Sequence, residues 1–173
     1  MTASEDLEAL LALQRASFST ARRSVLRGWP EEQALDAEGL AELLARRYCV
    51  LATGRADGRP QAMPVAFLVA ESAFWFGTGT GGRLRNLRAL PWCSVVVMVG
   101  ERDVGESEGE PHRVVAAEGP VRLHEGEALT GARSRLDAAW SRKHRQPPDW
   151  AAALIELRPE RLFSHGARAD LGR

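Results

Sequence analysis

Apolar residues recur at helical spacing near the start of the chain. Four leucines between residues 7 and 13 follow a potential N-cap at Ser4, and this pattern predicts an amphipathic helix. A second helix is predicted over residues 36–47, where three leucines lie on one side, and the Trp29-Pro30 pair separates the two helices. The first forty-odd residues are therefore expected to be helical.

From Tyr48 the apolar pattern changes to one typical of β-strands. Strands are predicted over residues 48–53, 61–69, 73–78, 93–99, 113–124 and 152–163, and further helices over residues 83–89 and 125–143. The Asp57-Gly58 pair predicts a tight hairpin, and the links among the first three strands are too short for a parallel crossover. Six short antiparallel strands with few helices indicate a small β-barrel. Residues 100–111 are acidic and contain glycine, and we expect them to form a mobile loop.

The composition is that of a soluble globular protein, with 45% hydrophobic residues in a chain of 173. This length fits one domain, and we assign residues 1–47 to an N-terminal helical extension, 48–166 to the barrel and 167–173 to a C-terminal tail. The 23 basic residues balance 23 acidic ones, so no global field favours nucleic acid as a partner. Any bound anion must be held by a local cluster.

Neither membrane insertion nor secretion is predicted. The first residues are acidic, unlike the start of a signal peptide, and the longest apolar stretch, residues 62–70, is too short to span a bilayer. We expect a cytoplasmic protein without a membrane partner.

Residues that could bind a metal or act as a nucleophile form no recognisable constellation. Cys49 and Cys93 lie in separate apolar strands, where a buried free thiol is the usual state. No pair among the four histidines has metal-ligand spacing. No triad or nucleophile elbow is visible, so we predict no metal site and name no catalytic residue.

The most informative stretch is the glycine cluster at residues 77–82. It matches a dinucleotide-binding GxGxxG and nearly matches a phosphate-binding loop, but the preceding strands form hairpins, and Arg83 and Leu84 stand where the loop requires Lys and Ser or Thr. Glycines still let backbone amides approach a ligand, and the start of a helix favours anions. Because Arg83, Arg85 and Arg88 crowd this short helix, we predict a phosphate site here, with a solvated helix face as the alternative.

Several segments of the chain resemble one family. The succession Cys49-Val50-Leu51-Ala52-Thr53, Asp57-Gly58-Arg59-Pro60-Gln61, the strand to Thr78, and Arg83-Leu84-Arg85-Asn86-Leu87 before Pro91 resembles the pyridoxamine 5'-phosphate oxidase-like split-barrel family. More narrowly, it is similar to the flavin/deazaflavin oxidoreductase branch. The resemblance covers roughly residues 48–166.

The resemblance implies a mainly β fold, a six-stranded antiparallel split β-barrel of Greek-key type, which forms a homodimer with flavin in a groove between subunits. It places Met63, Pro64, Val65 and Ala66 along the isoalloxazine ring, and Thr78 and Gly79 around the ribityl-phosphate. Arg83 matches the family's phosphate-binding basic residue, and Arg85 and Asn86 follow it in the same pattern.

The chain also departs from the family pattern. Pyridoxamine phosphate oxidases carry an arginine where this chain has Met63, a lysine near Leu68, and a serine or arginine at the position of Gly81. We therefore do not expect vitamin B6 oxidation. FMN is the expected cofactor, and coenzyme F420 is the alternative, because its polyglutamate tail suits an arginine-rich groove. Haem bound through a histidine such as His165 is a minor alternative.

The function implied is that of an oxidoreductase which transfers hydride or electrons to a small organic substrate. The cofactor would supply the redox chemistry, which agrees with the absence of a visible triad. The alternative is a split-barrel protein that binds flavin or haem without turnover. A nucleic-acid-binding barrel is disfavoured by the neutral charge and the single lysine.

Overall fold

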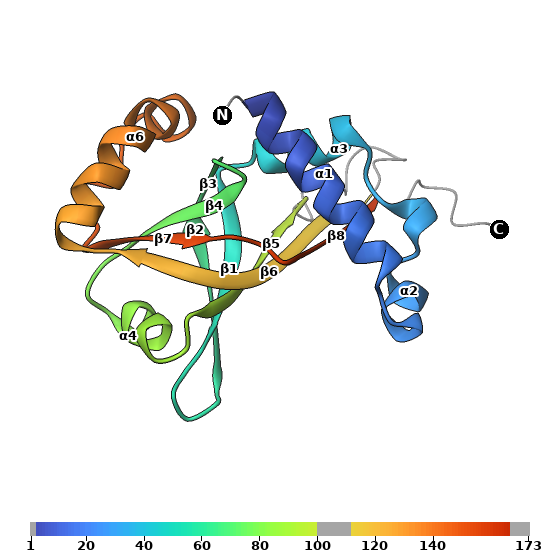
Figure 1. Cartoon of the computed structure of the whole chain (residues 1–173), viewed down its shortest axis with the longest axis horizontal. Coiled ribbons are helices and arrows are strands. Elements are labelled where there is room, and N and C mark those ends of the chain that lie inside the picture. The colour runs from blue at the N-terminus through green and yellow to red at the C-terminus, as the bar shows by residue number, and fades with distance from the viewer. Residues whose placement is uncertain (1–2, 100–111, 167–173) are drawn as a thin grey trace.

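The structure, a computed structural model, describes residues 3–99 and 112–166 (Figure 1). The loop predicted at 100–111 and the tail predicted at 167–173 lie outside the described residues. The N-terminal part forms α1 (Ala3–Ser19), α2 (Arg23–Gly28), the short 3-10 helix η1 (Glu31–Gln33) and α3 (Ala37–Leu44). The later helices are α4 (Gly82–Ala89) and α6 (Gly126–His144). The strands are β1 (Tyr48–Gly54), β2 (Pro60–Ala66), β3 (Leu68–Ala70), β4 (Ala73–Thr78), β5 (Trp92–Met98), β6 (Arg113–His124), β7 (Ala153–Leu157) and β8 (Arg161–Gly166).

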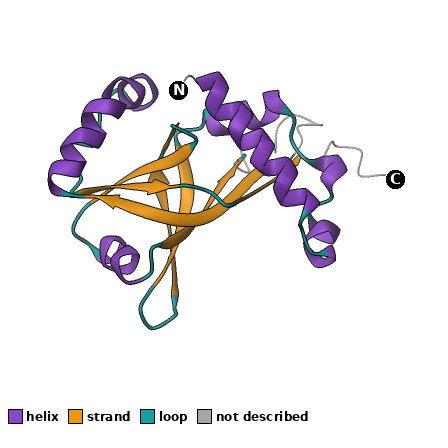
Figure 2. Cartoon of the chain, in the orientation of Figure 1, coloured by secondary structure: helices purple, strands orange, loops and turns teal. Residues whose placement is uncertain are grey.

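All strand pairs are antiparallel, in the order β2-β1-β5-β6-β7-β4-β3, with β8 also paired to β6. The long strand β6 pairs with β5 and β8 along its first part and with β7 along its last part, so the sheet curls around it into a half-barrel (Figure 2). The predicted mainly β class is confirmed.

The prediction of six strands is wrong, because two predicted strands are each broken in the structure. The segment 61–69 breaks at Phe67, whose backbone N–H bonds to Arg47 O instead of a neighbouring strand. The segment 152–163 breaks between β7 and β8, where the chain crosses over Gly119. A Cβ atom on Gly119 would lie 2.4 Å from Arg158 O, so this crossing requires glycine.

The main core fills the inside of the half-barrel. It is built from Phe67, Phe74, Phe76, Ile155 and Leu157, with the inward residues of β1 and β5. A second apolar cluster lies on the opposite face of β4 and β7, where α6 packs Leu136 and Trp140 onto Trp75 and Leu154. Helix α6 is thereby fixed across the outside of the barrel.

The N-terminal helices pack directly on the barrel. Leu10, Leu40 and Leu43 are fully buried members of the main core. The helix predicted at 36–47 is observed as α3, and Asp36 caps it by accepting a hydrogen bond from Gly39 N at 2.9 Å. The predicted N-cap at Ser4 is wrong, because Ser4 lies inside α1.

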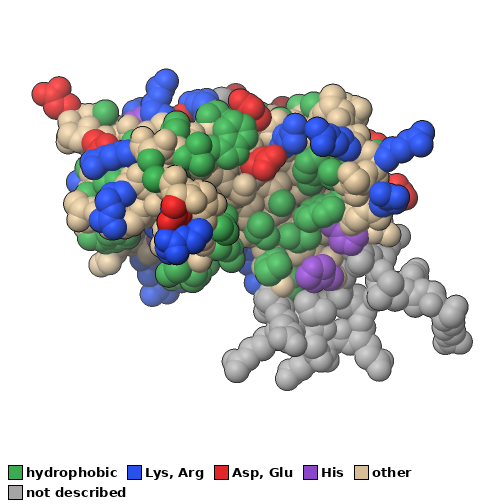
Figure 3. Space-filling view, turned by 90° about the horizontal axis from the view of Figure 1, so that it is seen from below, with side chains coloured by type: hydrophobic (Ala, Val, Ile, Leu, Met, Phe, Trp, Pro, Cys, Tyr) green, Lys and Arg blue, Asp and Glu red, His purple; other side chains and the backbone are tan. Residues whose placement is uncertain are grey.

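The outer face of the sheet formed by β1, β2 and β5 is apolar. Cross-strand register aligns Pro64, Val50, Val96, Ala116 and Phe163 in one row. We call Tyr48, Val50, Pro64, Trp92, Val96, Met98 and Ala116 the outer apolar face. Figure 3, seen from below Figure 1, shows apolar side chains gathered on this side of the molecule. Contiguous apolar surface of this kind is typical of a protein–protein contact.

Candidate functional site

A cavity of about 460 Å³ lies between the edge strand β2 and the end of α6. Its size is typical of small-molecule sites. Strand β2 and the start of α4 form one wall, and the end of α6 with the following loop forms the other. The lining residues are Tyr48, Pro64, Val65, Ala66, Gly77, Arg83, Trp140, His144, Gln146, Pro147, Pro148 and Trp150. We call this space the β2–α6 cavity.

The structure brings four of the predicted site residues to this cavity: Pro64, Val65, Ala66 and Arg83. The other five do not line it. Met63 is exposed near its edge, Thr78 is buried and donates from Oγ1 to Gly79 O at 3.3 Å, and Arg85 is exposed on the first turn of α4.

Asn86, which the family resemblance links to the cofactor, makes protein contacts instead of lining the cavity. Its Nδ2 donates to Thr53 Oγ1 at 3.1 Å and to Gln61 Oε1 at 2.8 Å. These bonds tie α4 to both strands of the β1–β2 hairpin. Asn86 therefore fixes the position of Arg83 relative to β2.

The N-terminus of α4 is open. Its N-cap, Gly81, supplies no side-chain hydrogen bond, and a Cβ atom built on Gly79 or Gly81 would meet nothing within 4 Å. The first backbone N–H groups of the helix thus lack a side-chain cap. The first turn holds no acidic residue, so this end of the cavity combines free amides with the guanidinium of Arg83.

Arg83 is half-buried, and burial lowers the pKa of its guanidinium. No ion pair to Arg83 occurs within residues 3–99 and 112–166, whereas Arg88 of the same helix pairs with Glu125. Among the described lining residues there is also no Asp or Glu. A partly buried cation without a counter-charge is costly unless an anion joins it.

The second wall of the cavity was missed in the sequence. Pro148, in the loop after α6, packs so closely on β4 that a Cβ atom on Gly77 would lie 2.9 Å from it. Arg133 Nη2 holds the same loop by donating to the carbonyl oxygens of Pro148, Asp149 and Ala151. The wall is therefore built into the fold.

Lys143 and His144 fasten this wall to the barrel. Lys143 Nζ donates to Leu44 O at 2.8 Å and lies 3.6 Å from the centre of the Phe67 ring. His144 Nε2 bonds to Phe67 O at 2.8 Å. Burial lowers the pKa of Lys143 to about 8, and burial also lowers the pKa of His144, with help from the charges of Lys143 and Arg47. At pH 7 the imidazole is mainly neutral and the ammonium mainly charged.

The two cysteines are inert thiols in the core. Burial raises the pKa of Cys49 to about 12, although the positive charges of Lys143 and Arg83 oppose the shift. Burial likewise raises the pKa of Cys93 to about 12. Thiols rather than thiolates are present at neutral pH, so neither residue is a nucleophile. Because the charges of Lys143 and Arg83 both act on Cys49, the two cations lie near the same strand, β1.

A larger cavity, of about 620 Å³, lies between the η1–α3 segment and β6. Four of its lining residues are acidic, and its single arginine, Arg113, is already paired with Glu42. An anionic ligand would be repelled there. Over residues 3–99 and 112–166, no group of three or more possible metal ligands occurs, and no helix is long and apolar enough to cross a membrane.

Comparison with known proteins agrees with the predicted family. The sequence profile of the pyridoxamine 5'-phosphate oxidase family matches residues 35–166, which is most of the chain. No curated protein matches by sequence.

Solved structures share the fold at low identity. An FAD-binding protein from Mesorhizobium loti has a TM-score of 0.59 and 23% identity, over 78% of this chain and 96% of that chain. The haem storage protein HutZ from Vibrio cholerae has a TM-score of 0.55 and 17% identity, over 76% and 94%. An F420 reductase has a TM-score of 0.50 and 24% identity, over 70% and 93%. At such identities the similarity shows a shared fold only. The names of these three proteins refer to three different ligands, FAD, haem and F420.

Proposed function

Because the chain belongs to the pyridoxamine 5'-phosphate oxidase family, we propose that it is an oxidoreductase that binds FMN in the β2–α6 cavity. Coenzyme F420 is the alternative cofactor. The observation that carries this proposal is Arg83, which lines the cavity without an ion pair among the described residues and stands at the uncapped N-terminus of α4. This is the arrangement that a phosphorylated ring compound requires.

The phosphate end of the site fits its ligand in charge and in space. Arg83 would donate charge-assisted hydrogen bonds to the phosphate, and the backbone N–H groups after Gly81 would add to them. The open space at Gly79 and Gly81 lets the ligand approach the backbone closely. Arg85, exposed on the same turn, adds positive charge at the rim.

The ring end fits a flat apolar group. Strand β2 is at the edge of the sheet, and its residues Pro64, Val65 and Ala66 line the cavity. Trp140 and Pro148 line the opposite wall. These residues exclude water and hold a ring in one plane. A bound flavin or deazaflavin supplies hydride transfer, while the protein supplies position and electrostatics.

The substrate class is a small organic acceptor that enters at the open side of the cavity. Tyr48 and Trp150 stand there with 67% and 70% of their surface exposed. Their aromatic faces would contact a substrate laid over the cofactor ring.

The outer apolar face supports a homodimer. It adjoins the cavity, because Tyr48 and Pro64 belong to both. A second copy would cover this face beside the cofactor site and leave the Trp150 side of the cavity open to substrate. Val96→Arg places a charge in the middle of the apolar row and is expected to yield monomers in sedimentation velocity. Arg142→Glu, on the exposed side of α6, is the control and should leave the dimer intact.

Cofactor binding is tested by a visible spectrum of the purified protein, followed by titration with FMN and with F420. Micromolar binding of either compound, together with reduction of an added acceptor, supports the proposal. Binding without turnover over a broad acceptor panel favours the storage or sensing alternative. A Soret band with no flavin binding would overturn the proposal in favour of haem.

A further inference from the structure

Lys143 is the only lysine of the chain, and its ammonium donates to Leu44 O at the end of α3. Its ammonium is fixed over the ring of Phe67, the residue directly after the cavity-lining Ala66. The next residue on α6, His144, lines the cavity itself. The position of this charge relative to the β2 wall is thus set by two contacts, one to Leu44 O and one to the Phe67 ring.

No negative charge balances Lys143 in the part of the chain that the structure describes. The titratable groups that act on it or on its neighbours are Cys49, His144, Arg83 and Arg47. At neutral pH the first two are uncharged and the last two are positive. Among the described residues, one of the three ammonium hydrogens has an oxygen acceptor, which is Leu44 O. The described residues therefore leave this cation, which lies over Phe67 and precedes the cavity-lining His144, without a compensating negative charge.

The redox reaction would place a negative charge on that side of the barrel. Hydride transfer from a reduced nicotinamide donor adds one hydrogen nucleus and two electrons to a flavin or deazaflavin ring. The ring then carries one more negative charge unless a proton follows. The same hydride leaves for the acceptor, which takes its proton from water. A fixed cation stabilises the charged state when little water screens it.

We propose that Lys143 is an electrostatic positioning residue that stabilises the reduced, negatively charged form of the cofactor bound in the β2–α6 cavity. This inference rests on the proposed function. It differs from the role of Arg83, which meets the phosphate and is indifferent to the oxidation state of the ring. It also differs from a purely structural role, in which Lys143 would only fasten α6 to Leu44.

The test measures the midpoint potential of bound FMN by a dye-coupled spectroscopic titration at pH 7. Lys143→Met removes the charge and keeps the apolar stem, and Lys143→Arg keeps the charge. Arg142→Met removes a charge from the adjacent, exposed position of α6 and is the matched control. If FMN does not bind but F420 does, the same measurement uses F420.

In Lys143→Met we expect the preference for the reduced over the oxidised cofactor to fall about tenfold, which lowers the potential by about 30 mV for a two-electron couple. Lys143→Arg and Arg142→Met should stay within a few millivolts of wild type. The potential of wild type should also fall more steeply with pH above about pH 8, where the ammonium loses its proton.

Equal potentials in wild type and Lys143→Met, with FMN bound in both, overturn the assignment while the proposed function stands. A wild-type protein that binds neither cofactor overturns both. If Lys143→Met does not fold, the pH dependence of the wild-type potential decides. An unchanged slope between pH 7 and pH 9.5 then refutes the role of Lys143, and a steeper slope above pH 8 supports it.

Discussion

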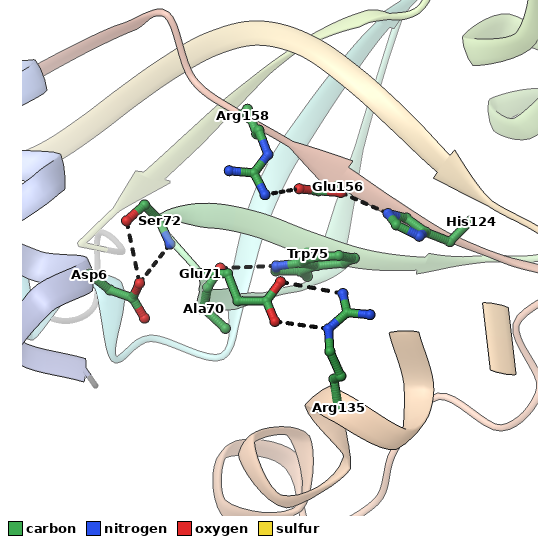
Figure 4. A network of polar contacts seen from close by, with 9 residues as sticks. All are labelled: Asp6, Ala70, Glu71, Ser72, Trp75, His124, Arg135, Glu156 and Arg158. Carbon is green, nitrogen blue, oxygen red and sulfur yellow. Dashed lines mark hydrogen bonds and ion pairs between the residues drawn. The ribbon is translucent and has the colours of Figure 1, made fainter. Parts of the chain in front are cut away.

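Two groups of charged side chains in the molecule differ in charge balance. In one group, Glu156 accepts from His124 at 2.7 Å and pairs with Arg158, while Arg135 pairs with Glu71 at 3.0 Å (Figure 4). The ring of Trp75 lies between them, 5.0 Å from the ring of His124. We call this the balanced network. In the other group, Arg83 lines the cavity and Lys143 precedes the cavity-lining His144, and neither has a carboxylate partner among the described residues.

The comparison distinguishes charged side chains that stabilise the fold from charged side chains that are available to a ligand. In the balanced network each cation has its anion within the fold, so it contributes to stability and has no free capacity for a ligand. Around the cavity the fold carries the cost of cations that only an external anion would offset. Net charge alone could not reveal this, because the whole chain is neutral.

The largest expected effect comes from breaking the balanced network. Glu156 is 2% exposed, and Glu156→Ala leaves the buried imidazole of His124 without its partner. We expect the free energy of unfolding to fall by about 3 kcal/mol, measured by urea denaturation. FMN affinity of the folded variant should be unchanged. Glu118→Ala, which breaks an exposed pair with Arg161, should cost less than about 1 kcal/mol. A loss in Glu156→Ala no larger than this control would show that the network is dispensable.

Removing the positive charge of Arg83 should weaken cofactor binding and leave stability unchanged. Arg83→Ala is expected to weaken FMN binding at least tenfold, because a charge-assisted phosphate contact contributes about 1.5–3 kcal/mol. Its free energy of unfolding should not fall, since no ion pair is lost. Isothermal titration calorimetry and urea denaturation measure the two quantities.

Arg88→Ala is the matched control on the same helix. Arg88 is exposed and paired with Glu125, and its loss should change FMN affinity less than threefold. Equal losses at Arg83 and Arg88 would indicate a diffuse field around α4 instead of a phosphate site.

A change where β4 meets the loop after α6 should lower both stability and cofactor affinity. The methyl group of Gly77→Ala would lie 2.9 Å from Pro148 Cβ, and overpacking of this kind costs about 1–3 kcal/mol. Because Pro148 lines the cavity, FMN affinity should fall together with stability. Gly131→Ala, on the exposed side of α6 with open space around its Cβ, should alter neither. A stability loss with unchanged affinity would show that the loop wall does not contact the ligand.

The smallest effect concerns the pH dependence of stability. Burial alone would raise the pKa of Glu156, but the hydrogen bond from His124 and the charge of Arg158 outweigh it and hold the pKa below its usual value. Its contribution is therefore fully present above the unfolded pKa, near 4.5, and is lost as the pH falls through the lower folded value. In Glu156→Gln the acid-induced loss of stability below pH 4.5 should be shallower than in wild type. Identical slopes would mean that other carboxyls govern acid unfolding.

Part of one wall of the cavity could be named from the sequence. The glycine cluster and the arginines that follow it led to the prediction of an anion site at the start of α4, and the family resemblance named Pro64, Val65 and Ala66, which line the cavity together with Arg83. The role of β2 as an edge strand follows from strand order, which depends on contacts between residues far apart along the chain.

The second wall could not be predicted, because its contacts are non-local. His144 reaches Phe67 across 77 positions and Lys143 reaches Leu44 across 99, and no spacing rule connects such pairs. The strand break at Phe67 has the same origin, since its N–H bonds to Arg47. Phe67 is apolar and aromatic, so the sequence pattern predicts that the strand continues through it. Only the tertiary partner of its backbone N–H reveals the break.

The polar contacts of α1 bear on the order in which the chain can fold. Ser17 Oγ accepts from the backbone of Leu162, and Gln14 accepts from Ser164 Oγ, across 145 and 150 positions. Helix α1 therefore cannot complete these polar contacts until β8 is in place. Contacts of such long separation slow the final step of folding. A chain in which β8 is not yet paired leaves the apolar side chain of Leu10 incompletely covered, and exposed apolar surface of this kind favours aggregation.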